Sequence, residues 1–444
     1  MKSNIVYLPL ARTTFSMPDA EDNFNKSCRL LESLAENLYK PQELLTSPEA
    51  LSDFVEKATR PGLIIYQCAT FIGGDFVMEL TRRFNCPVVV WSVREPSIDG
   101  GRLKLNSLTG AFSAGNNLYM HNCNYRFIFG NPDEPSVVQS FKDLFSALEI
   151  TEKLKELVIG IVGTPPPGFD FGNLDEALLA SKLGVKITKI EVANIINTAN
   201  SYSQKDIATA ITELKERTKG WESFPAENIE KHARLRTAYQ EFVSNNGIKA
   251  LASRCWPDFF TEYGAPVCSV LSFLNDSGIA TSCETDMGGA ISMFIGSELT
   301  GSAVYFGDPV AVDESCNGIV FWHCGAGATS LARKKEGAKL GVHPNRKIGP
   351  TMEFGLKSGE VTVMRMGKDR EGFRMMAMKG VALDEPQKFW GTSVVVKPES
   401  GASQAKVAEL VSAGWEPHFV VAYGDIVEKL RLMCDFIGIP FIKY

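Results

Sequence analysis

The sequence contains little histidine, no closely spaced cysteine pair and no excess of positive charge. Histidine occurs only five times in 444 residues, and none of the ten cysteines forms a CxxC pair. Without such pairs the sequence indicates neither a zinc ribbon nor a thioredoxin-like redox motif. Several cysteines, such as Cys68 and Cys268, lie in apolar, strand-like runs. We therefore expect reduced, buried thiols and a cytoplasmic protein.

Long apolar runs are also missing. No segment has the about 18 consecutive apolar residues that a membrane-spanning helix needs. Arg12 interrupts the short apolar stretch near the N-terminus. This stretch is therefore not the apolar core of a signal peptide, and no cleavage site follows it. The formal net charge of -6 does not favour binding to nucleic acid or to an anionic membrane. A small solute is therefore the expected partner.

The order of helical and strand-like patterns predicts three domains, because a chain of 444 residues exceeds one ordinary core. Residues 1–153 and 154–309 each alternate apolar strand-like runs with helical segments, which is typical of an open, parallel, Rossmann-like sheet. Residues 310–444 contain short strand-like runs separated by glycine-bearing turns, which predict a β-rich domain. The expected fold class is therefore α/β, with two parallel-sheet domains followed by a β-rich C-terminal domain.

Two acidic residues lie in apolar surroundings near the ends of predicted strands. Glu284 stands between an apolar run and a glycine pair that opens a helix, and Asp308 ends the run SAVYFGD. Asp286 is a third carboxylate close to Glu284. A carboxylate removed from water is unstable unless it is paired, protonated or bound to a cation. Asp286 or Asp308 could instead simply cap a helix or a turn.

Two of the five histidines also lie at predicted strand ends. His323 ends the run GIVFWHC, and His418 precedes FVVAYGD. A single histidine in such a place is more often a hydrogen-bonded structural residue than a ligand. Together with the two carboxylates, however, the histidines form a set of oxygen and nitrogen donors that suits Mn²⁺ or a similar divalent cation.

Several segments, taken in order, resemble the core of the L-fucose isomerase and L-arabinose isomerase family of sugar isomerases. They are RCWPDFF at 254–260, APVCSVLSFLNDSGIATSCETDMGGA at 265–290, YFGDP at 305–309, WHCGAGA at 322–328 and PHFVVAYGD at 417–425. The N-terminal half is similar more loosely, through LPLARTTF, YQCATFIGGD and GIVGTPPPGFDF. The resemblance covers nearly the whole chain and implies the domain arrangement of L-fucose isomerase.

The resemblance also implies a metal site. In that family a divalent cation, usually Mn²⁺, is held by a glutamate, an aspartate and a C-terminal histidine, which match Glu284, Asp308 and His418 here. L-Arabinose isomerases use a further histidine, whose nearest match is His323, as a fourth ligand or as a neighbour of the ligands. The family pattern further implies a homo-oligomer in which the N-terminal domain covers the metal site of a neighbouring subunit.

These residues suit the interconversion of an aldose and a ketose. The reaction removes a weakly acidic proton beside a carbonyl, and a cation chelated by the sugar oxygens O1 and O2 stabilises the enediolate. Either Glu284 or Asp308 would move the proton between C2 and C1 while the other exchanges a proton with the sugar oxygens. The sequence leaves the assignment of these two roles open.

Polar residues in expected loops are candidates for substrate binding. In the first predicted domain these are Arg12, Thr14, Gln67, Asn106 and Asn116, with the stretch 106–117 expected to be a loop. Turn chemistry would equally explain the asparagines. Nearer the acidic segment, Arg254 and Trp256 could line the pocket beside His323, although core packing would also explain Trp256.

The sequence leaves the sugar open among pentoses, deoxy sugars and anionic sugars. Arg12, Arg94, Arg102 and Arg254 make an anionic sugar, such as a sulfonated one, worth testing. A sugar-binding protein without enzymatic activity is the main alternative, because α/β domains with aromatic and asparagine-rich loops would also fit a receptor. A receptor would not need the glutamate, aspartate and histidine together. A nicotinamide-dependent oxidoreductase is disfavoured because GIVGTPPPG lacks the G-x-G-x-x-G order.

Overall fold

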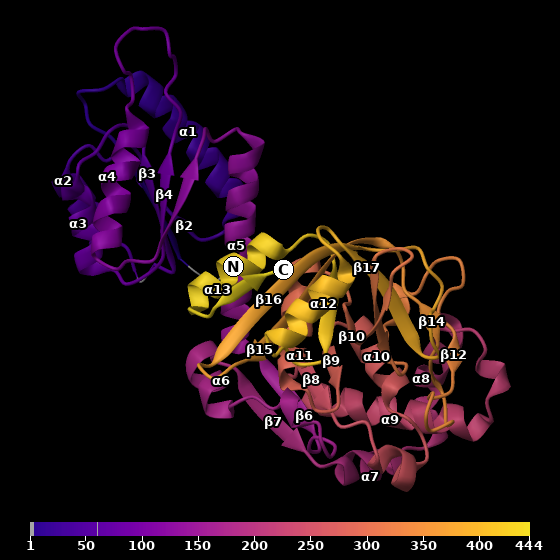
Figure 1. Cartoon of the computed structure of the whole chain (residues 1–444). Coiled ribbons are helices and arrows are strands. Elements are labelled where there is room, and N and C mark those ends of the chain that lie inside the picture. The colour runs from indigo at the N-terminus through magenta and orange to yellow at the C-terminus, as the bar shows by residue number, and fades with distance from the viewer. Residues whose placement is uncertain (1–3, 60) are drawn as a thin grey trace. The chain divides into compact units, whose positions relative to one another are not determined.

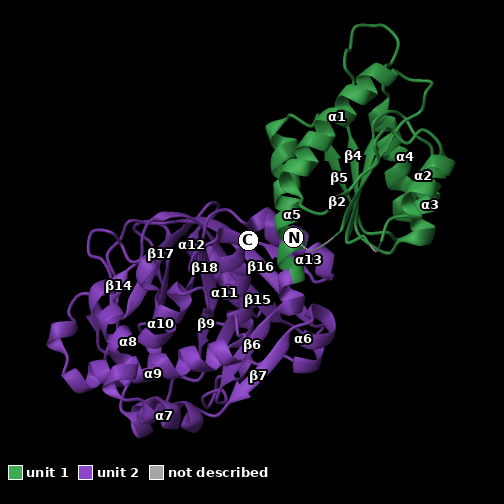
Figure 2. Cartoon of the chain, turned by 180° about the vertical axis from the view of Figure 1, so that it is seen from behind, with its two compact units in different colours: residues 1–152 green, residues 153–444 purple. Residues whose placement is uncertain are grey.

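The computed structural model describes residues 4–59 and 61–444. The chain divides into two compact units, which are coloured separately in Figure 2. Unit 1 runs to Glu152, and unit 2 comprises Lys153–Tyr444. In the described part of the chain, no helix is long and apolar enough to cross a membrane.

Unit 1 is built on a five-stranded parallel sheet of order β2-β1-β3-β4-β5. Its elements are β1 (Ile5–Leu10), α1 (Met17–Leu34), β2 (Leu38–Tyr39), α2 (Pro48–Val55), β3 (Leu63–Cys68), α3 (Gly74–Arg83), β4 (Val88–Ser92), α4 (Ser107–Met120), β5 (Tyr125–Phe129) and α5 (Pro135–Glu156). Figures 1 and 2 show α2, α3 and α4 on one face of the sheet and α1 and α5 on the other. Strands β1 and β3 are buried along their whole length, as apolar strands of a covered parallel sheet should be. The predicted open parallel sheet in this part of the chain is confirmed.

One prediction in unit 1 is wrong, because residues 107–120 form helix α4 and not a loop. Asn106 precedes the helix with a positive φ of 53°, and its side-chain oxygen accepts a hydrogen bond from Thr109. The segment is rich in Asn, Ser and Gly, which individually disfavour helices. Ala111, Ala114 and Leu118 are nevertheless buried on one face of α4, and such burial outweighs the low intrinsic propensity.

Unit 2 begins with a four-stranded parallel sheet of order β7-β6-β8-β9. Its elements are β6 (Val158–Val162), α6 (Glu176–Leu183), β7 (Lys186–Ile190), α7 (Val192–Ser201), α8 (Gln204–Arg217), α9 (Ala226–Asn245), β8 (Ala250–Ser253), α10 (Cys268–Asp276), β9 (Ala280–Cys283) and α11 (Met287–Thr300). A second parallel sheet was expected here and is confirmed. The prediction of a strand at Cys268 is wrong, because this segment forms α10, a helix that is buried on nearly every side. A segment that is buried on nearly every side lacks the one-sided apolar periodicity that separates a helix from a strand.

The rest of unit 2 contains a small antiparallel pair, β12 (Leu340–Gly341) and β13 (Thr351–Met352), and an eight-stranded sheet of order β14-β17-β11-β10-β18-β15-β16-β19, in which β16 also pairs with β17. The strands are β10 (Tyr305–Asp313), β11 (Gly318–His323), β14 (Phe354–Gly355), β15 (Gly359–Lys368), β16 (Phe373–Ala382), β17 (Thr392–Pro398), β18 (Phe419–Tyr423) and β19 (Phe441–Lys443). The extra pairing joins β17, β11, β10, β18, β15 and β16 into a closed, antiparallel barrel. The predicted β-rich C-terminal region is confirmed. Strand β10 spans the division predicted between residues 309 and 310.

Helices α12 (Ser403–Ser412) and α13 (Val427–Ile437) complete unit 2. The core of the barrel is apolar and includes Phe321, Val363, Met376 and Val421, all fully buried or nearly so. Helix α11 packs between the two sheets of the unit, against β9 on one side and β15 and β18 on the other. The ends of β9 and β11, the first half of β10 and the segment before β18 therefore come together around the N-terminus of α11. The prediction that Asp308 ends its strand is wrong, because β10 continues to Asp313.

Candidate active site

Glu284, Asp308 and His418, which we call the carboxylate–histidine cluster, lie together in unit 2. The Nε2 atom of His418 is 3.0 Å from a Glu284 carboxylate oxygen and 3.3 Å from an Asp308 oxygen. Glu284 follows β9, Asp308 belongs to β10, and His418 precedes β18. Three residues separated by up to 134 positions are thus brought to one point by the junction of the parallel sheet with the barrel.

Two donor–donor distances of the cluster, both measured from His418 Nε2, fit a divalent cation. Ligands at right angles around a cation at about 2.1 Å lie about 3 Å from one another, which matches both distances. Two carboxylates and one imidazole are also ligands that Mn²⁺ accepts. The exposed fraction of the Asp308 side chain is 30%, against 2% for His418, so the cluster is reached from the Asp308 side.

Asp286 sets the orientation of His418. The Nδ1 atom of His418 lies 2.8 Å from Asp286 Oδ2, and both side chains are buried. A carboxylate only accepts hydrogen bonds, so Nδ1 carries a proton, and Nε2 is directed at Glu284 and Asp308, where it would offer its lone pair to a bound cation. This is the usual arrangement of a metal-binding histidine and its supporting carboxylate. Asp286 also caps α11 by accepting from Gly289, as the alternative interpretation of this residue predicts.

Arg365 balances the charge of Asp286. Its guanidinium donates two hydrogen bonds, of 2.6 and 3.0 Å, to the two oxygens of Asp286, and both side chains are fully buried. A buried pair with two parallel hydrogen bonds is rigid, because both the charge and the geometry are satisfied. The chain of contacts from Arg365 through Asp286 to His418 therefore fixes the imidazole from behind.

The turn that carries Glu284 is strained. Glu284 and Thr285 have φ values of 58° and 60°, so two successive non-glycine residues adopt the left-handed conformation. Each such residue costs about 1 kcal/mol or more, and the surrounding structure must hold it. Backbone hydrogen bonds from Thr285 to Ser253 and from Asp286 to Cys283 do so. Strain of this kind is concentrated at functional sites.

The cluster has an excess of negative charge that changes the pKa values of its members. Burial alone would lower the pKa of His418, but hydrogen bonds to Asp286 and Glu284 and the charge of Asp308 raise it to about 10. Burial raises the pKa of Asp308 above its usual value. Burial also acts to raise the pKa of Asp286, yet Arg365 and His418 hold it well below the usual range. Such a site attracts a proton or a cation.

Aromatic side chains border the cluster. The rings of Phe171 and Phe306 lie 5.0 and 4.6 Å from the imidazole of His418. The indole N–H of Trp256 donates to Glu284 over 3.3 Å, and Phe169 packs edge-on against that indole. Trp256, which was expected either to line the pocket or to pack in the core, thus contacts Glu284 directly. These rings form an apolar wall that limits the access of water.

His323 lies close to the cluster. A nitrogen of its ring, an oxygen of Glu284 and a nitrogen of His418 all lie within 4.8 Å of one another, so all three could bind the same cation. On its other side the Nδ1 atom of His323 is 3.5 Å from the Cys324 sulfur. Cys324, Cys268 and His343 form a second group of close polar atoms, with the two sulfurs 3.8 Å apart. Sequence reasoning treated Cys268 only as a buried thiol, and its burial is confirmed.

Three of the predicted substrate residues of unit 1, Arg12, Gln67 and Asn106, have side-chain partners within that unit. Gln67 is fully buried; its amide donates to Ser27, and its oxygen accepts from the hydroxyl of Tyr7. Arg12 pairs with Asp75 at 2.6 Å. The side-chain amide of Gln67 is thus hydrogen-bonded at both ends within the core of unit 1, and it is not accessible to a sugar. Thr14 and Asn116 are exposed.

Most of the arginines named as candidates for an anionic sugar also have partners. Arg94 pairs with Glu134 at 2.7 Å, and Arg102 donates to the backbone oxygen of Thr14. Arg254 forms an ion pair with Asp258 and also donates to the oxygens of Thr164 and Pro165. Its guanidinium holds the loop after β6 in place.

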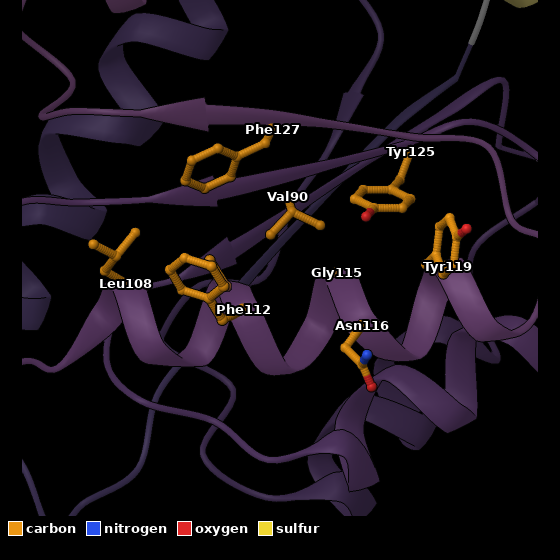
Figure 3. A pocket seen from close by; sticks show the side chains of 9 residues that line it. Val90, Leu108, Phe112, Gly115, Asn116, Tyr119, Tyr125 and Phe127 are labelled. Carbon is orange, nitrogen blue, oxygen red and sulfur yellow. The ribbon is translucent and has the colours of Figure 1, made fainter.

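Unit 1 also contains a concave surface, which we call the apolar groove. It has a volume of about 410 Å³ and lies between α4 and strands β4 and β5. Figure 3 shows the aromatic rings of Phe112, Tyr119, Tyr125 and Phe127 around it. The lining contains no carboxylate and no histidine, so the groove lacks the groups that proton transfer to a sugar requires.

Two features of the site were missed by sequence reasoning. Arg365 interrupts the apolar run GEVTVMRM, and a charged residue inside such a strand could have indicated a buried ion pair. Phe171 lies in GIVGTPPPGFDF, where the Gly and Pro content indicated only a turn. Neither sequence feature predicts which residue is contacted in the fold. Arg365 and its partner Asp286, for example, are 79 positions apart.

Comparison with known proteins identifies the class of this chain. No protein-family model matches it. The chain is 45% identical over 443 residues to a sulfoquinovose isomerase of Clostridium sp. (strain MSTE9), with 99% of both chains covered. It is 42% identical over 431 residues to the sulfoquinovose isomerase of Priestia megaterium, with 96% of both chains covered, and 40% identical over 444 residues to that of Alkalicoccus urumqiensis, with 99% covered.

Identity at this level along nearly the whole length defines an enzyme, an aldose–ketose isomerase and hence an intramolecular oxidoreductase. More narrowly, the chain belongs to the sulfoquinovose isomerase family. The prediction of a sugar isomerase is confirmed, and the alternative of a sugar-binding protein without enzymatic activity is set aside.

Proposed function

We propose that this chain interconverts a sulfonated aldose and the corresponding ketose through a cis-enediol intermediate. The observation that carries the proposal is the carboxylate–histidine cluster, in which Glu284 and Asp308 lie 3.0 and 3.3 Å from the same histidine nitrogen. The relatives are named for sulfoquinovose, a six-carbon sugar with a sulfonate at the end opposite its aldehyde carbon. Sulfoquinovose is therefore the first substrate to test.

The proposal includes Mn²⁺ or another divalent cation, held by Glu284, Asp308 and His418 with His323 beside them. When bound, the cation would polarise the sugar carbonyl and stabilise negative charge on O1 and O2. The residues suit this task because oxygens of Glu284 and Asp308 lie 3.0 and 3.3 Å from His418 Nε2, and because the contact with Asp286 keeps this nitrogen directed at the site. Donor atoms of Glu284, His323 and His418 also lie within 4.8 Å of one another.

The chain's own residues would move the protons. One of Glu284 and Asp308 takes the proton from C2 and returns it to C1, while the other shifts a proton between the sugar oxygens. No atoms are gained or lost, so no co-substrate is required. Phe171 and Phe306 would keep water from the imidazole side, which strengthens the electrostatic interactions of the reacting groups.

An arrangement like that of L-fucose isomerase remains part of the proposal, with a homo-oligomer in which unit 1 of a neighbouring subunit covers the cluster. Arg12, Thr14, Asn106 and Asn116 would then contribute polar groups to the sugar. Mixing inactive Arg12→Ala protein with inactive Glu284→Ala protein should restore part of the activity as hybrid oligomers form. No recovery, although native mass spectrometry shows subunit exchange, would contradict the sharing of sites.

The chemistry is tested by following sulfoquinovose with the Mn²⁺-loaded enzyme in D₂O by NMR. A cis-enediol route lets the abstracted proton exchange with solvent, so deuterium should appear at C1 of the ketose or at C2 of the recovered aldose. Ketose formation without any label would support a hydride shift instead and would remove the base role from Glu284 and Asp308.

A further inference from the structure

A sulfonated sugar needs a cation that is not already neutralised near the carboxylate–histidine cluster. The nearby arginines of unit 2 differ in this respect. Arg365 is fully buried against Asp286, and Arg254 is paired with Asp258. Arg346, in contrast, is exposed and has no carboxylate partner among the described residues. Of these three arginines, Arg346 is the one that remains available to an anionic ligand.

The position of Arg346 is set by the aromatic wall of the site. Its guanidinium carbon lies 5.3 Å from the ring centre of Trp256 and 5.9 Å from that of Phe260. The same Trp256 indole donates its N–H to Glu284 over 3.3 Å. The guanidinium and Glu284 therefore both contact the same indole ring.

The loop that carries Arg346 is held in place before any ligand binds. The backbone N–H groups of Asn345 and Arg346 both donate to His343 Nδ1 at 3.3 Å. Two backbone hydrogen bonds, from His343 to Ile348 and from Lys347 to His343, close the loop. The His343 ring packs edge-on against Phe260, with the ring centres 4.9 Å apart. A fixed loop lowers the entropy cost of ordering its side chains around a ligand.

Lys347 extends the positive surface toward the other side of the cluster. Its Nζ lies 4.2 Å from the ring centre of Trp390, and no carboxylate partner is found for it in the described ranges. The backbone oxygen of Trp390 accepts from the indole of Trp322, which pairs with Asp308 across strands β10 and β11. The adjacent side chains of Arg346 and Lys347 thus stack on Trp256 and Trp390. Trp256 contacts Glu284, and Trp390 contacts the pair of strands that carries Asp308.

We propose that Arg346 binds the sulfonate of the substrate while the carbonyl end lies at Glu284, Asp308 and His418, with Lys347 adding positive charge. This inference rests on the proposed function. A guanidinium matches the sulfonate oxygens because it can donate two parallel hydrogen bonds to one anion. Stacking on Trp256 keeps the guanidinium plane oriented and leaves its edge N–H groups available.

The test compares wild-type enzyme with Arg346→Gln and with Arg370→Gln. Arg370 is a matched control, because it is an exposed arginine of the same unit in the β15–β16 turn. Loss of a hydrogen-bonded ion pair should raise the KM for sulfoquinovose about tenfold to a hundredfold in Arg346→Gln, with kcat close to wild type. Arg346→Lys should recover part of the loss, since it keeps the charge but not the paired donors.

The uncharged 6-deoxyglucose, used as a competitive inhibitor, separates sulfonate binding from a general change in the site. Its Ki should be the same for wild-type and Arg346→Gln enzyme. An equal rise in Ki and KM would overturn the assignment, because it would mean that Arg346 supports the shape of the site. An unchanged KM in Arg346→Gln would also overturn it, and the proposed function would stand.

Calorimetric titration with sulfoquinovose gives the same comparison without turnover. Wild-type protein that binds sulfoquinovose in an Arg346-dependent manner but does not convert it would support the sulfonate site and contradict the proposed function. Wild-type protein that converts an uncharged aldose and does not bind sulfoquinovose would overturn both.

Discussion

The carboxylate–histidine cluster of unit 2 and the apolar groove of unit 1 differ in charge, in burial and in how many elements build them. The groove is formed by one helix and two neighbouring strands, and its rings are open to solvent, with 74% of Phe112 and 71% of Tyr119 exposed. The cluster joins residues that follow β9, lie within β10 and precede β18, and behind it Asp286 and Arg365 are fully buried. Forming the cluster therefore costs desolvation and backbone strain, whereas the groove costs neither.

The difference shows that the size of a concave surface does not locate the chemistry of this protein. The groove has a defined volume of about 410 Å³ but no group that titrates near neutral pH. The cluster is recognised instead by charges that are desolvated and mutually dependent, with pKa values moved in opposite directions for His418 and Asp286. Variants in the two regions should consequently have very different effects.

The largest effect is expected for Glu284→Gln, which keeps the size of the side chain but removes its charge. We expect kcat for sulfoquinovose to fall about a thousandfold or more, because both cation binding and proton transfer are affected. Steady-state kinetics at saturating Mn²⁺ provide the measurement. Glu371→Gln, at an exposed glutamate of the same unit, serves as the control and should leave kcat unchanged.

Asp286→Asn should mainly affect stability. The substitution leaves Arg365 buried without its counter-charge, and breaking a buried pair in this way costs about 3 to 5 kcal/mol of unfolding free energy. Chemical denaturation followed by circular dichroism measures the loss. Glu428→Gln breaks the exposed pair with Arg431 and should have little effect. Similar stability losses in the two variants would show that the Asp286–Arg365 pair does not hold the site together.

Much of the fold could be predicted from the sequence, because apolar runs of four to eight residues and glycine-bearing turns carry strong local signals. Both parallel sheets and the β-rich region were predicted in this way. Helices α4 and α10 were missed, since α4 is rich in residues that disfavour helices and α10 is buried on nearly every side, so it has no one-sided apolar pattern. In both cases tertiary burial decides the conformation, and local sequence does not report it.

The site could be predicted only in part. Glu284, Asp308 and His418 were found because polar residues at strand ends and a family resemblance pointed to them, and the structure brings them together. The contact of Asp286 with Arg365 could not be predicted, because no local pattern pairs residues from a helix N-terminus and a distant strand. Arg346 was overlooked for a similar reason, since its place over Trp256 depends on the folded loop.

A smaller effect is expected for Phe171→Ala, which removes the ring next to His418. We expect kcat to fall about three- to tenfold, in line with the loss of one aromatic contact and better access of water to the imidazole. The same truncation at the apolar groove, Phe127→Ala, should leave kcat unchanged, because Phe127 is half exposed and contacts no reacting group. Equal losses in both variants would remove the distinction between the two regions.

The smallest effect is expected for Phe112→Ser in the groove. Because most of this side chain is already exposed, the unfolding free energy should change by no more than about 0.5 kcal/mol. Metal content, measured on the same sample, should equal that of wild type. A loss of bound metal in this variant would connect the groove to the cluster and break the comparison.

The central claim is that Glu284, Asp308 and His418 hold a divalent cation on which isomerisation depends. The most direct measurement is the metal content of purified wild-type and His418→Ala protein by mass spectrometry, combined with activity after chelation and after addition of Mn²⁺. The account predicts bound metal in the wild type and its loss in the variant, with activity of the wild type abolished by chelator and restored by Mn²⁺. Full isomerase activity in metal-free wild-type protein would contradict it.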